Sequence, residues 1–172
     1  RMVVKGQSVA FEKGGDTLFA NMYAAYDALS EPMRDRLAKM TAVNGGPYIY
    51  TARGGKLQFS AREDARHEGD TVFSTAVQPV IRTHPETGRK SIYLHPGKVE
   101  RIEGMTPPDS KDFVDELMEA IIQPEVVYRH EWQLGDLVLW DNRAVLHLAH
   151  RDYDPAEQRI MHRVLLKGDR PC

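Results

Sequence analysis

Apolar residues recur at intervals of three and four in three stretches, the spacing that buries one face of an α-helix. The first stretch is Thr17–Leu29, and the second follows Ser30, whose side chain is suited to capping a helix. The third is the clearest, and we expect Asp109 or Ser110 to cap it and Pro124 to end it, because proline cannot continue a helix. Its apolar positions are Phe113, Val114, Leu117, Met118 and Ile121.

Other stretches carry the alternating or short apolar pattern of β-strands. Gln7–Glu12 predicts one strand, and Val77–Arg82 and Lys90–Leu94 predict a hairpin around a turn at Pro85–Gly88. Three further strands close the chain, in "EVVYRHEW", "DLVLWD" and "RIMHRVLL". Strands that follow one another closely pair antiparallel, so the sequence predicts a mainly β sandwich or barrel with helices packed outside.

The segment from Thr41 to Asp70 shows little periodicity and is rich in glycine and charged residues. A loop of that length in a compact domain is usually a functional lid or a flexible segment. We therefore expect one domain over residues 1–172, with a lid or flexible insertion at 41–70.

Charge and composition exclude several classes of partner. Lys and Arg number 23 against 25 Asp and Glu, so no broad field favours nucleic acid or an anionic membrane. No apolar run approaches the roughly 20 residues that span a bilayer. The single cysteine, Cys172, allows no internal disulfide and fits a reducing cytoplasm, where we expect the protein to be.

Two arginines, Arg159 and Arg163, are four residues apart in the last predicted strand, so alternation puts them on one face, roughly 13 Å apart. That face is either exposed to solvent or lines a cavity. In a cavity each guanidinium would need an anion, and each could grip a carboxylate or a sulfonate through two hydrogen bonds.

Each remaining candidate residue has two interpretations. His147 is either a structural residue or a metal ligand. His150 and Asp152 form an H-x-D that would suit a metal on a strand, but their charge-rich surroundings favour a solvated loop. His162 lies opposite the two arginines, and we expect it to be a core or a hydrogen-bonded residue. Thr17, in "GGDT", caps a helix by default, with a ligand role as the alternative.

Four stretches resemble, in order and spacing, the taurine/2,4-dichlorophenoxyacetate dioxygenase (TauD/TfdA) family: "GGDTLFANMYAAYDALSEPMRDRL", "PVIRTHPETGRKSIYL", "GDLVLWDNRAVLHLAHRDYDP" and "RIMHRVLLKGDRP". The resemblance covers the chain from Gly14 onward. It implies a double-stranded β-helix, or jelly-roll, that binds Fe(II) through two histidines and a carboxylate. It also implies 2-oxoglutarate as cosubstrate.

The resemblance assigns roles to four residues. His147 matches the family's distal iron-binding histidine. Arg159 and Thr17 match the residues that hold the far carboxylate of 2-oxoglutarate, and Arg163 matches a residue placed to meet an anionic group of the primary substrate or cosubstrate.

One part of the family pattern is absent. The other two iron ligands form an H-x-D upstream of "GGDT", but only thirteen residues precede Gly14, and none is histidine or aspartate. We therefore expect part of the N-terminal region to be missing, so that this sequence belongs to a longer polypeptide.

The resemblance further implies a reaction. Dioxygen would hydroxylate a small organic anion of the sulfonate, sulfate ester or aryloxy/carboxylate type, with release of succinate and CO2. The protein would be a homo-oligomer, a dimer or tetramer, with no nucleic acid or membrane partner. The alternative is an inactive jelly-roll remnant that binds a small anion or supports oligomerisation.

Overall fold

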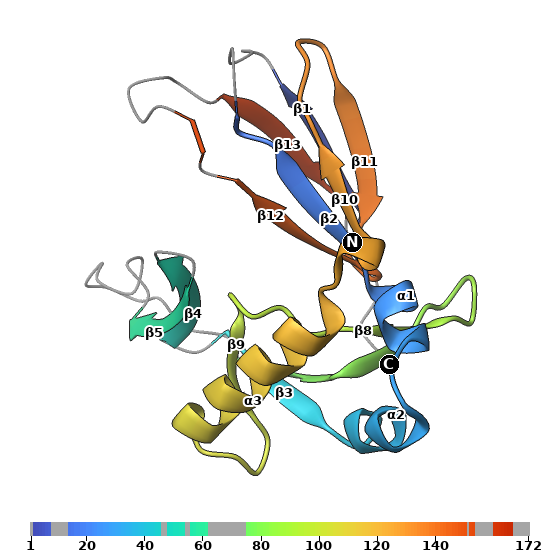
Figure 1. Ribbon diagram of the computed structural model, residues 1–172, viewed down its shortest axis with the longest axis vertical. Helices are drawn as coiled ribbons and strands as arrows, with labels where there is room; N and C mark the ends of the chain where they lie inside the picture. Colours follow the sequence, from blue (N-terminus) through green and yellow to red (C-terminus); the bar gives the residue numbers. More distant parts are fainter. Residues whose placement is uncertain are drawn as a thin grey trace.

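The computed structural model of the chain describes residues 2–7, 14–45, 48–53, 56–61, 75–150, 152–153 and 160–166. Its elements form two parts that are joined through β2 and α1 and again where α3 leads into β10 (Figure 1). One part holds six strands, and the other combines helices with short sheets.

Two antiparallel three-stranded sheets make up the six-stranded part (Figure 1). One has the order β11-β1-β13 and the other the order β10-β2-β12. The bounds are β1 (Met2–Gln7), β2 (Thr17–Asn21), β10 (Val127–His130), β11 (Leu137–Asp141), β12 (Val145–Ala149) and β13 (Met161–Leu165). Two facing sheets with exclusively antiparallel pairing agree with the expected jelly-roll class.

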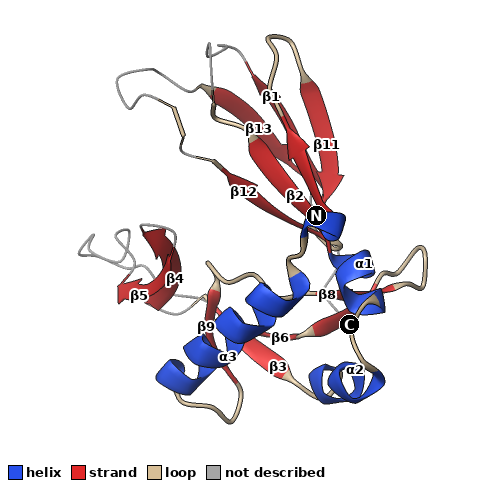
Figure 2. Cartoon of the chain, viewed as in Figure 1, coloured by secondary structure: helices blue, strands red, loops and turns tan. Residues whose placement is uncertain are grey.

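The second part holds the helices, a third sheet of order β6-β3-β9, and the hairpins β4–β5 and β7–β8 (Figure 2). Its strands are β3 (Thr41–Asn44), β4 (Tyr48–Arg53), β5 (Lys56–Ala61), β6 (Ala76–Pro79), β7 (Ile81–Thr83), β8 (Lys90–Ile92) and β9 (Val99–Ile102). Its helices are α1 (Met22–Asp27), α2 (Glu31–Leu37), α3 (Pro107–Ile121) and the 3-10 turn η2 (Pro124–Val126). Among the described residues, no helix is long and apolar enough to cross a membrane.

The start of the predicted first helix is wrong. Thr17–Asn21 is the strand β2, and only Met22–Asp27 is helical. Asn21 makes the change of direction, because its side-chain oxygen accepts hydrogen bonds from the backbone N–H groups of Tyr23 and Ala24. The apolar spacing of this stretch suits a helix, but pairing with a strand on each side decides the outcome.

The other helices lie close to their predicted positions. Ser30 precedes α2 as its N-cap residue, without a side-chain capping bond. The third helix ends before Pro124 as expected, but it is capped by Thr106 rather than by Asp109 or Ser110. The Ser110 hydroxyl is buried and accepts a hydrogen bond from the Ile102 N–H, which ties α3 to β9.

Most predicted strands are found with altered bounds, and several strands were missed. The predicted hairpin is present as β7–β8. Of the strand expected at Gln7–Glu12 only Gln7 is described, as the last residue of β1 (Met2–Gln7), and residues 8–12 lie outside the described residues. β2, β3, β4, β5, β9 and β12 were not predicted as strands. β12 matters most, because it carries His147.

The segment 41–70 is more regular than its sequence suggests. β3 is the central strand of its sheet, with Ala42 and Val43 buried, and β4 pairs with β5. Residues 41–44 therefore belong to the core and not to a flexible insertion. Residues 46–47, 54–55 and 62–74 lie outside the described part, and the lid stays a prediction.

The main core lies between α3, the β6-β3-β9 sheet and the two short helices. Leu37, Val80, Val99 and Val114 have no exposed surface there. Four fully buried side chains from four separate segments mean that this part packs as one unit.

We expect Leu37→Ala to destabilise the protein by about 2–5 kcal/mol, because it removes buried methyl groups and leaves a cavity. Leu134→Ala is the matched control, since Leu134 is 69% exposed in a turn. Urea unfolding followed by circular dichroism gives both values. Equal losses for the two variants would contradict the packing described.

Candidate functional site

β2 sets the geometry of the candidate site because it pairs with a strand on each side. Phe19 lies opposite His147 of β12 and opposite Tyr128 of β10. Thr17, two residues earlier, lies opposite Ala149. Thr17 and His147 therefore share one face of the sheet as diagonal neighbours, a relation that corresponds to roughly 7–8 Å between strands.

Aromatic rings from both sheets surround the His147 imidazole. Its ring centroid is 6.4 Å from that of Phe19, in the same sheet, and 5.0 Å from that of Trp140, in the other sheet. Phe19 and Trp140 are buried and meet edge to face at 5.1 Å. His147 thus lies between the two sheets, on the inner face.

Thr17 is buried on the same face, with 1% of its surface exposed. Its hydroxyl oxygen accepts a hydrogen bond from the Trp132 indole Nε1 at 2.9 Å. A hydroxyl that accepts one bond keeps its own hydrogen to donate, so Thr17 can offer a donor to an anionic ligand. The default interpretation of Thr17 as a helix cap is wrong, since the residue lies within a strand.

Arg163 lies on the inner face of the other sheet. The β1 position Val3 pairs with Trp140 on one side and with Leu165 on the other, so Trp140 and Leu165 share a face. Arg163 precedes Leu165 by two residues and shares that face. It is exposed, so its guanidinium is accessible to an anion. Arg159 lies outside the described residues, and its role stays a prediction.

The expectation for one nearby histidine needs correction. His162 is exposed on β13 rather than in the core. His150 and Asp152 are part of a charged cluster at the end of β12, where Nδ1 of His150 is 3.8 Å from Oδ2 of Asp152. The described residues contain no group of three His, Cys, Asp or Glu side chains able to hold a metal, so this H-x-D is not a metal site by itself.

The cluster around Asp152 was not anticipated from the sequence. Its Oδ1 accepts a hydrogen bond from the Gly15 N–H at 2.8 Å, and the Arg129 Nε donates to Oδ2 of the buried Asp16 at 2.5 Å. The Gly15 N–H lowers the pKa of Asp152, and the bond to Asp16 raises the pKa of Arg129. The start of β2 is thus held by charges from both neighbouring strands.

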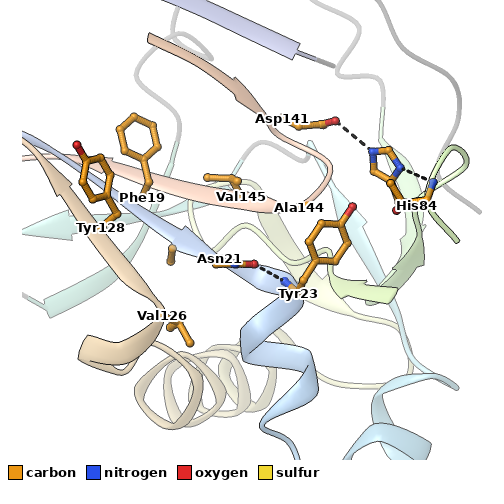
Figure 3. Close-up of a pocket in the computed structure, with 11 residues that line it drawn as sticks. Phe19, Asn21, Tyr23, His84, Val126, Tyr128, Asp141, Ala144 and Val145 are labelled. Carbon is orange, nitrogen blue, oxygen red and sulfur yellow. Dashed lines mark hydrogen bonds and ion pairs between the residues drawn. The ribbon is translucent and has the colours of Figure 1, made fainter. Parts of the chain in front are cut away.

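A second cluster fixes the turn between β11 and β12. Nδ1 of the buried His84 faces the N–H groups of Glu86 and Thr87, each at 3.3 Å, so the ring proton sits on Nε2, 3.2 Å from Oδ2 of Asp141 (Figure 3). Arg143 donates to the same carboxylate. Partial burial raises the pKa of Asp141, but the hydrogen bonds from Arg143 and His84 outweigh it and hold that pKa below its usual range. The hairpin β7–β8 is thereby joined to the end of β11, next to the turn that leads into β12 and His147.

A cavity of about 490 Å³ lies beside this turn. Phe19, Val126 and Tyr128 line one end, while His84, Asp141 and Tyr23 line the other (Figure 3). The cavity therefore extends from Phe19, which lies opposite His147 in the sheet, to the cluster of His84 and Asp141.

His95 is a further histidine in the electrostatic neighbourhood of His147. Burial, then the charge of Lys98 and that of His147, lower its pKa from 6.5 to about 4. Its Nδ1 accepts a hydrogen bond from the Gly97 N–H at 3.1 Å. Nothing in the spacing of the histidines along the sequence revealed this proximity.

The donor set does not by itself fit an iron centre. His147 is in place on the inner face, but the described residues add no further pair of ligands around it. Neutral imidazole is a good ligand for Fe(II), yet the three-ligand arrangement needs two more donors. The described part of the chain therefore offers one candidate ligand, His147.

The sequence family that matches is described as taurine catabolism dioxygenase TauD, TfdA family, over residues 7–165. The chain belongs to this family. Among solved TauD/TfdA-like structures, that of AAD-2 in complex with Mn(II) and N-oxalylglycine superposes with a TM-score of 0.80 at 32% identity. It covers 99% of this chain and 64% of AAD-2. A taurine dioxygenase from Burkholderia xenovorans gives a TM-score of 0.77 at 29% identity, covering 99% of this chain and 53% of that protein.

Curated TauD/TfdA relatives carry several substrate names. The chain is 35% identical to the pentalenolactone F synthase of Streptomyces arenae, covering 95% of this chain and 56% of the relative. It is 36% identical to an (S)-phenoxypropionate/alpha-ketoglutarate-dioxygenase of Sphingobium herbicidovorans, covering 91% and 53%. It is 35% identical to an alpha-ketoglutarate-dependent sulfate ester dioxygenase of Pseudomonas putida, covering 95% and 54%. The chain spans about half the length of these relatives.

The lowered pKa of His95 predicts how stability varies with pH. The unfolded state takes up a proton near pH 6.5, whereas the folded state stays neutral down to about pH 4. His95 therefore does not lower the free energy of unfolding above pH 6.5, and its destabilising effect grows as the pH falls toward 4. When the pH is lowered from 7 to 5, the free energy of unfolding of the wild type should fall by about 2 kcal/mol more than that of His95→Asn. Urea unfolding across this range measures the difference, and parallel pH curves would contradict the assignment.

Proposed function

We propose that this chain forms the His147-bearing part of an Fe(II)- and 2-oxoglutarate-dependent dioxygenase that hydroxylates a small organic anion. The observation that carries the proposal is the register of β2, which places a buried threonine hydroxyl and an imidazole side by side on the inner face of one sheet. Family membership supplies the reaction class.

Thr17 is proposed to donate its hydroxyl hydrogen to the far carboxylate of 2-oxoglutarate, while its oxygen accepts the hydrogen bond from Trp132 that orients the hydroxyl. A hydrogen bond to a carboxylate at a buried position stabilises binding more than the same hydrogen bond would in water. Arg159 is proposed as the charged partner of that carboxylate, on the strength of the family motif. The related AAD-2 was solved with N-oxalylglycine, which differs from 2-oxoglutarate by an N–H in place of one methylene.

His147 is proposed as an iron ligand. When bound, Fe(II) supplies the activation of dioxygen that couples substrate oxidation to conversion of 2-oxoglutarate into succinate and CO2. Phe19 and Trp140 restrict the rotation of the His147 ring and keep water from its flanks. The H-x-D pair that would complete the ligand set is expected in the part of the relatives that this chain does not span.

Arg163 is proposed to hold the anionic group of the primary substrate. Arg163 lies on the inner face of its sheet, and its side chain is exposed, so a substrate that enters from solvent can reach it. A guanidinium binds sulfonate, sulfate and carboxylate alike through paired hydrogen bonds. The names of the relatives, which include a sulfate ester dioxygenase and a phenoxypropionate dioxygenase, cover the same chemical range. A cytoplasmic location and a homo-oligomeric state remain predictions.

An anaerobic titration with Fe(II) and 2-oxoglutarate tests the proposal on the polypeptide that the complete open reading frame encodes. We expect a weak visible charge-transfer band that His147→Ala abolishes, because removing the imidazole removes one of three protein ligands. His162→Ala is the matched control, since that histidine is exposed on the outer face.

A folded protein that stays colourless would contradict the dioxygenase assignment. If calorimetry then still detected binding of 2-oxoglutarate in the absence of iron, the alternative of an anion-binding module would replace the dioxygenase assignment.

A further inference from the structure

The first residue before β2 is a buried carboxylate. Asp16 is 6% exposed, and its Oδ2 accepts a hydrogen bond from the Arg129 Nε at 2.5 Å. Its backbone carbonyl accepts a hydrogen bond from the His150 N–H at 2.8 Å. Burying a charged carboxylate is costly unless it is paired, so removing Arg129 would leave an uncompensated charge directly beside Thr17.

A second carboxylate reaches the same guanidinium from the exit of β12. Oδ2 of Asp152 is 3.4 Å from Nη2 of Arg129, while its Oδ1 binds the Gly15 N–H. Arg129, on β10, therefore bridges one acid directly before its neighbour β2 and another beyond the end of β12, the strand on the other side of β2. We call Asp16, Arg129 and Asp152 the strand-end clamp.

Gly14 allows this close approach. It has a φ of +85°, and a Cβ at its position would lie 2.6 Å from the backbone oxygen of Asp152. Any larger residue would push the β12 exit away from β2 and would be strained in the left-handed region. The glycine thus serves the clamp and not only a turn.

We propose that the strand-end clamp consists of positioning residues for cosubstrate binding, an inference that rests on the proposed function. The clamp acts through Thr17, which follows Asp16 directly and whose hydroxyl faces the inner side of the sheet. Asp152 lies five residues after His147, so the same contact fixes the end of the strand that carries the proposed iron ligand.

The clamp is suited to positioning because one of its sides is buried and the other is open. The Asp16 carboxylate is held inside, whereas Arg129 and Asp152 have side chains 49% and 39% exposed. Removing the Asp152 charge therefore leaves the buried pair intact. It also weakens the hydrogen bond from the Gly15 N–H, because a neutral amide oxygen accepts less strongly than a carboxylate, and this loosens the β12 exit and allows Thr17 to shift without unfolding the sheet.

The test uses the same complete polypeptide as the iron titration and measures N-oxalylglycine binding in the presence of Mn(II) through tryptophan fluorescence, since Trp132 contacts Thr17. We expect Asp152→Asn to weaken binding on the order of 10-fold, as loss of a partner that orients a ligand does, and Asp152→Glu to restore most of it. Asp27→Asn is the matched control, because Asp27 forms an exposed ion pair with Arg89 near α1.

A second readout is the indole N–H signal of Trp132 in a nitrogen-15 NMR spectrum. We expect Asp152→Asn to shift it, and Asp27→Asn to leave it in place. Wild-type binding that Asp152→Asn does not weaken would overturn the clamp. If the wild type bound no N-oxalylglycine, the proposed function would fail, and an unmoved Trp132 signal in Asp152→Asn would then overturn the clamp separately.

Discussion

The pairing of β2 with a strand on each side is the constraint on which the rest of the candidate site depends. It places Phe19 between Tyr128 and His147, and it sets Thr17 on the same face as that histidine. Trp140 then packs on Phe19 and His147 from the opposite sheet, so the register within one sheet also fixes the contact between the two. A slip of one residue would turn Thr17 and Phe19 to the other face and remove both contacts.

Charged clusters hold this register at its two ends. At the start of β2, Arg129 bridges Asp16 and Asp152, and at the end of β11, before the turn into β12, Asp141 is held by Arg143 and His84. Each cluster joins residues that are far apart in the sequence. Aromatic packing therefore provides the core of the site, while the ion pairs determine where each strand begins and ends.

The sequence predicted the β-rich class and two of the three helices closely, and it selected Thr17 and His147 as site residues only through resemblance to a family. It failed where tertiary pairing overrides local preference, as in Thr17–Asn21, whose apolar spacing equally suits a helix. It also missed β12, because a short strand next to a charged turn carries no periodicity of its own. The Asp16–Arg129 pair could not be anticipated, since only the register of β10 against β2 brings its residues together.

Paramagnetic broadening by Mn(II) tests most directly whether the inner face of this sheet is the metal-binding surface, because it detects even weak binding by a single imidazole. Titration into nitrogen-15-labelled protein should broaden the amide signals of His147, Phe19 and Trp140 first and leave those of α2 sharp. Broadening centred instead on His150 and Asp152, or on the exposed His162, would contradict the site described.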